Sequence, residues 1–406
     1  MNNTFIGILV GVVSLFVTTI MYPLVLNFAK RYNIVDNPNA RKLQRIPIPV
    51  MGGVAVYFGI LVGCLLLNSF IQSEFLLYGL LGMTIMMMIG VWDDVKDLSP
   101  LFRFLIEISL VGAFMALTGV YIDDFHGLWG IHDLEPWLAI PLSIVSGVGI
   151  INAVNLIDGV DGYASGYGIF ACICFGTCFW SVWSPLMVSL TLIVIGALLP
   201  FFMHNVFGIR SKMFMGDGGT LMLGMVMTMF VFFSMSSIQR CDQLEDNNIS
   251  LSAFSIAVLC IPIGDTLRVM MMRILRGRSP FSPDKTHLHH LFIDMGFSHL
   301  GAALFILLIN LMVVLSWLLS WHLGASIDMQ FYIVVGLGLL VTFGFYRFMK
   351  YQQGGGPVDE EGYPLGTALW HAMCKLGAHT RREDRRSWRM MRYLVDGPVF
   401  GRIIRK

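Results

Sequence analysis

Apolar residues form long unbroken stretches in this chain, separated by short polar segments, from the N-terminus to about residue 349. An α-helix needs about 20 such residues to cross the hydrocarbon core of a bilayer. Transmembrane β-strands would instead alternate apolar and polar residues over segments of about ten. The pattern predicts an all-α, polytopic integral membrane protein with about 11 transmembrane helices. They are expected at residues 4–29, 51–71, 76–92, 102–120, 136–156, 163–182, 186–206, 218–238, 252–272, 300–322 and 330–349.

The composition agrees with a membrane protein. Of the 406 residues, 56% are hydrophobic and only 13% are charged, about half the charged share of an ordinary soluble domain. These values exclude a soluble globular enzyme, a disordered chain and a nucleic-acid binder built on a basic surface. Because charged residues are scarce, the position of each one carries information.

The basic residues divide unevenly between the two sides of the predicted bundle. An odd number of spans puts the termini on opposite faces, and with the N-terminus outside, all 27 Lys and Arg residues except Arg240 lie on the inner side. Positive charge is retained on the cytoplasmic side of a membrane. We therefore expect the N-terminus outside, a membrane-embedded domain over residues 1–349, and a basic cytoplasmic tail over 350–406. The arginines between 381 and 392 fit either an interfacial helix on anionic lipid or a flexible tail.

Two adjacent carboxylates, Asp93 and Asp94, end the third apolar stretch. Ionisable groups at membrane depth are costly and usually functional. Two neighbouring carboxylates cannot both be buried and ionised without a cation. A divalent metal or a nearby lysine could supply that cation, and a solvated loop end is the alternative.

A polar stripe follows the fifth apolar stretch. Asn152, Asn155, Asp158 and Asp161 recur at offsets of three, which places them near one helix face. Such a face is a poor surface for lipid and a good polar seam inside a bundle. It indicates either a ligand site or a structural network between helices.

A glycine-rich segment, Met215–Thr220, precedes the eighth apolar stretch and contains Asp217. Backbone N–H groups at a helix N-terminus can approach an anion closely. A carboxylate in the same segment then requires a metal between itself and a phosphate.

Two inner loops carry basic residues and histidines. The loop over 273–290 contains His287, His289 and His290 with several cations, among them Arg278, and this indicates anion recognition. A zinc site is the alternative, although no companion cysteine occurs locally. In the first inner loop, Lys42 could bind phosphate at the membrane surface or simply contribute to positive-inside charge.

Together these groups gather on one predicted membrane face. Carboxylates suit Mg²⁺ or Mn²⁺, which commonly bridge to substrate phosphates, and Arg, Lys and His suit the phosphates themselves. This combination indicates phosphoryl-group chemistry between a water-soluble donor and a membrane-embedded acceptor. The chain has no Walker A motif, so ATP is not the obvious donor. It also has no H-E-x-x-H or G-x-S-x-G motif, so it lacks the common hydrolase signatures. A transporter is the alternative from another class, but it would spread its ionisable residues through the bilayer midplane.

At residues 1–345 the sequence resembles the polyprenyl-phosphate N-acetylhexosamine-1-phosphate transferases, of the glycosyltransferase family 4 type. The motifs occur in the family's order: DNPNARK-x₅-PIPVMGG, DDVKD, NAVNLIDGVDG, MGDGGT and SPFSPDKTHLHH. The His-x-His-His pattern is similar to the bacterial N-acetylglucosamine-1-phosphate branch, whereas the phospho-MurNAc-pentapeptide branch usually carries a contiguous His triplet. Gln44 and Thr220 stand where the family often has His and Ser. The first departure puts a catalytic role at that position in doubt, and the second keeps the hydroxyl.

The resemblance implies a reaction in a bacterial cytoplasmic (inner) membrane, with the active site on the cytoplasmic face. UDP-GlcNAc and undecaprenyl phosphate give undecaprenyl-diphospho-GlcNAc and UMP, with Mg²⁺ (or Mn²⁺), as the initiating step of O-antigen or cell-wall polysaccharide synthesis. Another UDP-sugar (GalNAc, a deoxy-HexNAc or MurNAc-pentapeptide) is the alternative donor. A homodimer is plausible by the same resemblance, and no nucleic-acid partner is expected.

The resemblance also implies roles for single residues. Asp217 is a metal ligand together with Asp94. The expected catalytic residues are Asp93, Asp94, Asp158 and Asp161, and the expected substrate-binding residues are Lys42, Asn152, Asn155, Arg278, His287, His289 and His290.

The chemistry of the acceptor constrains the mechanism. A phosphate monoester has a second pKa near 6 and is largely dianionic at pH 7, so it needs little help from a general base. We expect direct attack on the β-phosphorus of the donor, with positioning and charge stabilisation providing most of the catalysis. A covalent aspartyl-phosphate intermediate is the alternative.

Overall fold

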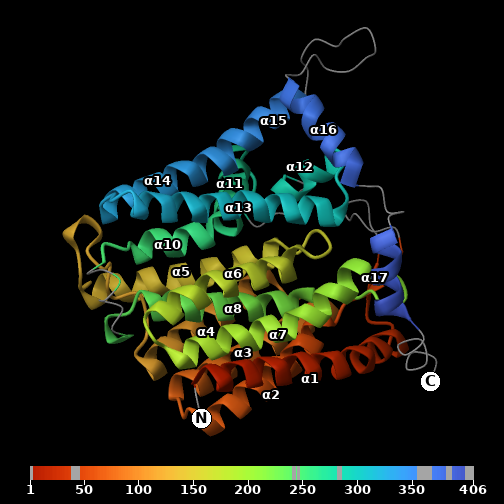
Figure 1. Cartoon of the computed structure of the whole chain (residues 1–406), viewed down its shortest axis with the longest axis horizontal. Coiled ribbons are helices and arrows are strands. Elements are labelled where there is room, and N and C mark those ends of the chain that lie inside the picture. Colours follow the sequence, from red (N-terminus) through yellow and green to blue (C-terminus); the bar gives the residue numbers. More distant parts are fainter. Residues whose placement is uncertain are drawn as a thin grey trace.

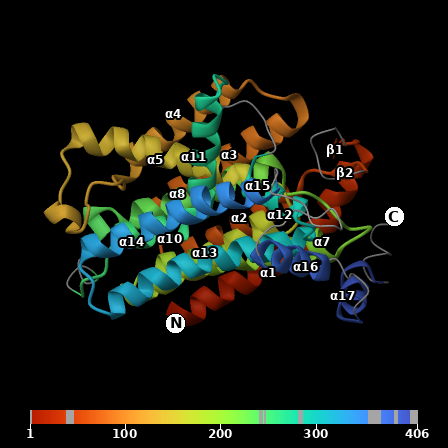
Figure 2. The same ribbon diagram turned by 90° about the horizontal axis from the view of Figure 1, so that it is seen from above.

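The computed structural model of the chain describes residues 3–37, 46–239, 244, 247–280, 286–353, 368–380 and 386–397. Within these residues, ten helices are long and apolar enough to cross a membrane, and a bent pair of shorter helices can make an eleventh. The helices run side by side as one bundle (Figures 1 and 2). The prediction of an all-α polytopic membrane protein is confirmed. The orientation relative to the two sides of a membrane stays a prediction.

The membrane-length helices are α1 (Asn3–Arg31), α2 (Gly52–Phe70), α3 (Glu74–Lys96), α4 (Pro100–Thr118), α5 (Pro136–Leu156), α6 (Tyr163–Ser181), α7 (Pro185–Phe207), α8 (Gly216–Ser234), α13 (His299–His322) and the continuous run of α14 (Ile327–Leu339), η3 (Leu340–Phe345) and α15 (Tyr346–Gln353). The shorter elements are β1 (Val35–Asp36), β2 (Ile48–Pro49), η1 (Leu128–Gly130), η2 (Ser237–Gln239), α10 (Leu251–Val258), α11 (Cys260–Leu275), α12 (Leu288–Asp294), α16 (Ala368–Thr380) and α17 (Arg386–Asp396).

The helix boundaries follow local sequence signals. Ser99 caps α4 by accepting a hydrogen bond from the Phe102 N–H, Pro100 occupies the first turn, and Gly119 ends the helix in the left-handed conformation. These are the residue types expected at the two ends of a helix.

The ninth predicted span, residues 252–272, is not one straight helix. The axes of α10 and α11 meet at 71°, beside Pro262, which cannot donate a backbone hydrogen bond. Asn310 of α13 takes up the groups freed by the break. Its side-chain nitrogen donates to the carbonyls of Ala257 and Val258, and its oxygen accepts from the Ile261 N–H. Broken backbone inside a membrane needs such internal partners.

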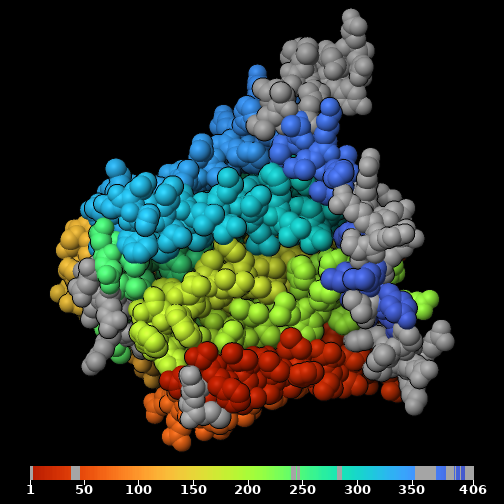
Figure 3. Space-filling model, in the orientation of Figure 1, coloured from red at the N-terminus to blue at the C-terminus, as the bar shows by residue number. Residues whose placement is uncertain are grey.

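Helix α8 lies at the centre of the bundle. Of its membrane-length stretch, 94% is buried, against at most 56% in the other membrane-length helices. Close packing needs small residues, and Gly90 of α3 lies so near the backbone of Asp217 and Gly218 that a Cβ there would overlap it. By contrast, α1 exposes a stripe of large apolar side chains that includes Phe16 and Ile20. The stripe fits contact with lipid, and Figure 3 shows α1 at the surface of the bundle.

One end of the bundle gathers the segments that matter for function. The C-terminal ends of α3, α5 and α7 and the N-terminal ends of α4, α6 and α8 meet there. The short β1–β2 pair joins them through a bridge between Val50 and Phe214. From the predicted tail, α17 packs on α7. The glycine-rich part of that tail, residues 354–357, lies outside the described residues.

Candidate active site

A cavity of about 690 Å³ opens at this end of the bundle. Its walls come from the β1–β2 pair, the end of α3, the α5–α6 loop, the start of α8 and the histidines of α12. The lining residues are Val35, Asp36, Val50, Asp93, Asp94, Asp97, Asn155, Asp158, Gly159, Val160, Asp161, Asn205, Phe214, Gly216, Asp217, His289, His290 and His299. The aspartates predicted at three separate places in the sequence, Asp93–Asp94, Asp158–Asp161 and Asp217, therefore share one cavity.

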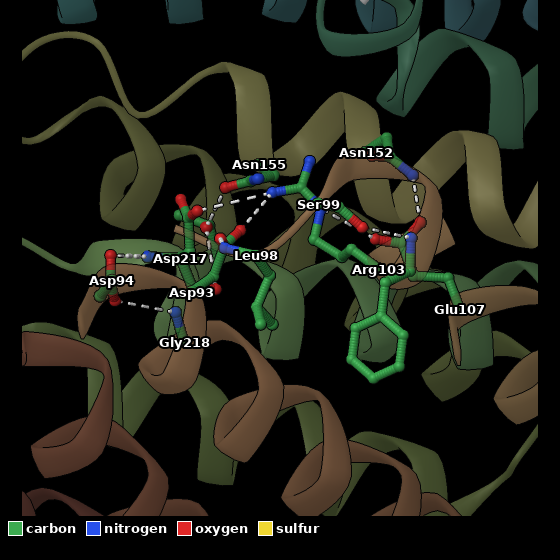
Figure 4. Close-up of polar contacts among 12 residues, drawn as sticks. Asp93, Asp94, Leu98, Ser99, Arg103, Glu107, Asn152, Asn155, Asp217 and Gly218 are labelled. Atoms are coloured by element: carbon green, nitrogen blue, oxygen red, sulfur yellow. Dashed lines mark hydrogen bonds and ion pairs between the residues drawn. The ribbon is translucent and has the colours of Figure 1, made fainter. Parts of the chain in front are cut away.

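Asp93 and Asp94 are neighbours in α3 but bind different partners (Figure 4). Asp94 accepts hydrogen bonds from the backbone N–H groups of Asp217, at 3.1 Å, and of Gly218, at 3.4 Å. It thereby caps the N-terminus of α8, where a negative charge is favoured. Asp93 accepts from the Leu98 N–H at 2.6 Å and pairs with Arg103 at 2.9 Å.

Arg103 of α4 links several of these carboxylates. Its Nη1 lies 2.9 Å from Asp93 Oδ2 and 3.5 Å from Asp217 Oδ2, and its Nε lies 3.5 Å from Glu107 Oε1. Glu107 is almost fully buried, with 1% exposure of its side chain, and Asn152 donates a hydrogen bond to it. Sequence reasoning missed both Arg103 and Glu107. The available signal was an acidic residue in the middle of the fourth apolar stretch with a cation one turn before it.

Asn155 ties the end of α5 to the start of α8. Its side-chain oxygen accepts a hydrogen bond from Thr220 Oγ1 at 2.6 Å. Thr220 is fully buried. Threonine stands here in place of the common serine, and its hydroxyl holds the start of α8 against the end of α5.

The α5–α6 loop carries two aspartates with opposite electrostatic surroundings. Asp158 is open to the cavity, but the protein around it removes bulk water. This desolvation, with the negative charges of Asp217 and Asp161, raises the pKa of Asp158 to about 7. Asp161 is also desolvated, yet the pKa of this carboxyl is lowered, because His299 and Lys212 outweigh burial. Lys212 Nζ and His299 Nδ1 lie 2.6 and 3.0 Å from Asp161 Oδ2, while Asp161 Oδ1 has no hydrogen-bond partner among the described residues.

The three histidines of the His-x-His-His motif lie in different positions and have different contacts. His289 and His290 line the cavity. His287 instead pairs with the buried Asp265 of α11 at 2.8 Å, and its ring stacks on His289 with 5.7 Å between centroids. Burial, with the neighbouring histidines, holds the pKa of His289 well below its usual range. The ring of His289 lies directly against Gly159, where a Cβ would overlap it.

The structure does not place every predicted residue on the cavity wall. Asn152 contacts Glu107, His287 contacts Asp265, and Arg278 is exposed on the surface, none of them among the lining residues. Lys42 lies outside the described residues. Their substrate-binding roles stay predictions. His299 and Lys212 were not anticipated, because only the fold brings them to Asp161.

The oxygen ligands available in the cavity fit a magnesium-type ion. No group of three His, Cys, Asp or Glu side chains in the described part of the chain already forms a metal cage, and this includes the histidine cluster considered for zinc. Mg²⁺ seldom uses an all-protein cage and is commonly held by one or two carboxylates plus substrate phosphates. Asp94 and Asp217, joined at the start of α8, can supply that pair.

Comparison with known proteins agrees with the geometry. The sequence model of Glycosyl transferase family 4 matches residues 76–235. A probable undecaprenyl-phosphate N-acetylglucosaminyl 1-phosphate transferase from Bacillus subtilis (strain 168) is 32% identical over 306 residues, which is 75% of this chain and 82% of the relative. The undecaprenyl-phosphate alpha-N-acetylglucosaminyl 1-phosphate transferase of Escherichia coli (strain K12) is 30% identical, covering 70% of this chain and 76% of the relative. The decaprenyl-phosphate N-acetylglucosaminephosphotransferase of Mycobacterium tuberculosis (strain CDC 1551 / Oshkosh) is 32% identical, covering 74% and 79%. With such matches over most of both chains, this protein belongs to glycosyl transferase family 4, the family of polyprenyl-phosphate N-acetylhexosamine-1-phosphate transferases that its motifs resemble.

Proposed function

We propose that the protein transfers GlcNAc-1-phosphate from UDP-GlcNAc to undecaprenyl phosphate, giving undecaprenyl-diphospho-GlcNAc and UMP, as the first step of a cell-surface polysaccharide. The observation that carries this proposal is the convergence of Asp93, Asp94, Asp158 and Asp217 on one cavity at the end of a membrane bundle. The relatives' names support the polyprenyl phosphate acceptor and the GlcNAc-1-phosphate group. They do not favour a transporter.

The place of the reaction follows from the charges. The cavity lies at the end of the bundle that also carries Lys30 and Arg31 of α1 and Lys96 of α3. Positive charge is retained on the cytoplasmic side. We therefore propose a bacterial cytoplasmic (inner) membrane location, with the cavity facing the cytoplasm. On that side, the water-soluble UDP-sugar can meet the phosphate of the lipid at the membrane surface. The homodimer stays a prediction that light scattering in detergent can check.

We propose that Asp217 and Asp94 hold Mg²⁺ (or Mn²⁺). When bound, such an ion neutralises negative charge on the donor's diphosphate. The carboxylates themselves are already oriented, since Asp94 is fixed by the start of α8 and Asp217 by Arg103. Rigidly placed ligands reduce the reorganisation needed at the moment of reaction.

The reaction then needs mainly alignment. An oxygen of the lipid phosphate attacks the β-phosphorus of UDP-GlcNAc. The new P–O bond forms as the bond to the UMP oxygen breaks, and UMP leaves with that electron pair. Asp93, held by Arg103 and the Leu98 N–H, is placed to orient the acceptor. We propose that His289 and His290, which line the same cavity, bind the donor's diphosphate or sugar.

Purified protein with labelled UDP-GlcNAc, undecaprenyl phosphate and Mg²⁺ tests the proposal. We expect a labelled lipid and one equivalent of UMP, both abolished by EDTA and restored by Mg²⁺. Asp217→Asn should remove activity, whereas Asp123→Asn, at the other end of the bundle beside Ser237, should not. Failure to form labelled lipid would refute the GlcNAc assignment, and parallel reactions with UDP-GalNAc and UDP-MurNAc-pentapeptide would identify another donor.

The same preparation separates direct attack from a covalent intermediate. Without lipid phosphate, direct attack releases no UMP and leaves no label on the protein. A phospho-sugar trapped on Asp93 or Asp217 would overturn direct attack.

A further inference from the structure

The C-terminal helix α17 sits beside the cavity end of the bundle (Figures 1 and 3). The ring of Trp388 packs on Phe207 at the end of α7, with 5.0 Å between centroids, and Val395 is buried. The helix is therefore docked on the membrane domain through an apolar contact. A tail that served only as an anchor on lipid would not require such a contact.

The last residue of α17, Asp396, binds the loop between α7 and α8. One carboxylate oxygen accepts from the backbone N–H groups of Ile209, at 2.7 Å, and Arg210, at 3.2 Å. The other accepts from the Ser211 N–H at 3.1 Å and from Ser211 Oγ at 2.6 Å. Three consecutive backbone N–H groups turned toward one anion form a nest that an aspartate side chain fills.

The same loop is held from the bundle side. Ser211 is fully buried, its Oγ lies 3.0 Å from His204 Nδ1, and its carbonyl accepts a hydrogen bond from the Tyr22 hydroxyl at 2.8 Å. Lys30 donates to the Arg210 carbonyl at 2.9 Å. Asp396 thus completes a set of contacts that fixes the loop from both sides.

The next residue after Ser211 reaches the cavity wall. Lys212 Nζ lies 2.6 Å from Asp161 Oδ2. Asn205 reinforces this connection, because its side chain accepts from the Gly162 N–H at 2.7 Å and donates to the Met213 carbonyl at 3.0 Å. A short path therefore runs from the C-terminal helix to an aspartate of the cavity: hydrogen bonds between Asp396 and Ser211, the peptide link to Lys212, and the ion pair with Asp161.

We propose that Asp396 is a positioning residue for the active site: by clamping residues 209–211 it holds Lys212 on Asp161. The C-terminal helix is then a structural part of the catalytic domain rather than an independent tail. The effect on turnover rests on the proposed transferase function, whereas the clamp itself does not.

Hydrogen exchange on the detergent-solubilised full chain tests the clamp without any substrate. In Asp396→Asn, the amides of residues 209–211 should exchange faster than in the wild type. Asp294→Asn is the matched control, because Asp294 is an exposed carboxylate that pairs with Lys350 at 3.4 Å. If Asp396→Asn does not fold, Ser211→Ala removes one donor to the same carboxylate and should give a smaller increase. Unchanged exchange at 209–211 in the folded variant would overturn the clamp.

A double-mutant cycle tests the link to the active site. We expect Asp396→Asn to lower kcat by roughly tenfold, less than the about 100-fold that a 1 Å misplacement can cost. Lys212→Met should also lower kcat, and the double variant should be no slower than Lys212→Met alone. Effects that multiply would show that Asp396 acts by another route and would overturn the positioning role. If the wild type forms no product, the transferase proposal fails, while the exchange experiment still decides the clamp.

Discussion

Arg103 Nη1 lies 2.9 Å from Asp93 Oδ2, and this one ion pair joins the end of α3 to the first turns of α4. The same guanidinium approaches Asp217 and Glu107 within 3.5 Å. Two carboxylates that line the cavity and one buried carboxylate therefore share the positive charge of Arg103. A planar guanidinium can serve several acceptors at fixed angles, whereas a lysine ammonium is a compact charge on a flexible stem.

Replacing this cation should damage both activity and stability. In Arg103→Met, the almost fully buried Glu107 loses the cation that lies 3.5 Å from it, which lowers the free energy of unfolding. We expect at least a 100-fold loss of kcat/KM and a lower midpoint of thermal unfolding in detergent. Arg103→Lys should retain part of both. The exposed Arg276 provides the control Arg276→Met, and equal behaviour of the two methionine variants would show that Arg103 has no special role.

The hydroxyl of Thr220 should matter more than its methyl group. Thr220→Ser keeps the 2.6 Å hydrogen bond to Asn155 and should retain nearly full activity. Thr220→Val leaves Asn155 without this donor, and an unsatisfied group costs about 1–3 kcal/mol, so we expect roughly a tenfold loss of kcat/KM. Steady-state kinetics on the two variants measure the difference. A valine variant as active as the serine variant would contradict this function of the hydroxyl.

Gly159 should be required for the position of the His289 ring rather than for backbone conformation. In Gly159→Ala, the new Cβ would overlap that ring, so the His289 ring must shift from its present position. We expect a higher KM for UDP-GlcNAc, while the thermal stability of the protein changes little. Gly149→Ala in α5 is the matched control, since a Cβ there meets no atom within 4 Å. A Gly159→Ala enzyme with unchanged KM would separate His289 from donor binding.

Much of the fold followed from the apolar pattern, because a bilayer accepts few arrangements other than long apolar helices. The bend between α10 and α11 did not, since the backbone groups freed there bind Asn310, which is 49 residues from Ile261 in the sequence. Asp93, Asp94 and Asp217 could be singled out because charge is rare in apolar surroundings. Arg103 was instead counted among the basic residues that set orientation, and its position between three carboxylates is a property of packing.

The contacts of the C-terminal tail could not be predicted from the sequence either. Its arginines predicted either a lipid-bound helix or a flexible segment, and neither prediction included the contacts of Asp396 with residues 209–211. An aspartate in a basic segment gives no local signal of its partners. The nest that binds it forms only when the α7–α8 loop is folded.

The raised pKa of Asp158 predicts a pH dependence of metal binding. Without metal, the folded protein favours the protonated carboxyl, whose pKa is about 7 against about 3.9 in an unfolded chain. This contribution to stability is fully present below the unfolded pKa and is lost as the pH rises through about 7. A metal near Asp217 favours the ionised carboxylate, so its binding must release a proton at acidic pH. Affinity should therefore increase between pH 6 and pH 8.

Thermal unfolding in detergent, with and without Mn²⁺, measures this effect without turnover. An ion that binds only the folded state stabilises it by RT ln(1 + c/Kd), where c is the concentration of free ion, so at a fixed concentration the stabilisation increases with affinity. In the wild type, the increase in unfolding temperature caused by Mn²⁺ should be larger at pH 8 than at pH 6. In Asp158→Asn this carboxyl is absent, so the increase should differ less between the two pH values than it does in the wild type. Because histidines titrate in the same range, the comparison with Asp158→Asn is what isolates the carboxyl. An asparagine variant that keeps the full difference between pH 6 and pH 8 would assign the pH dependence to another group.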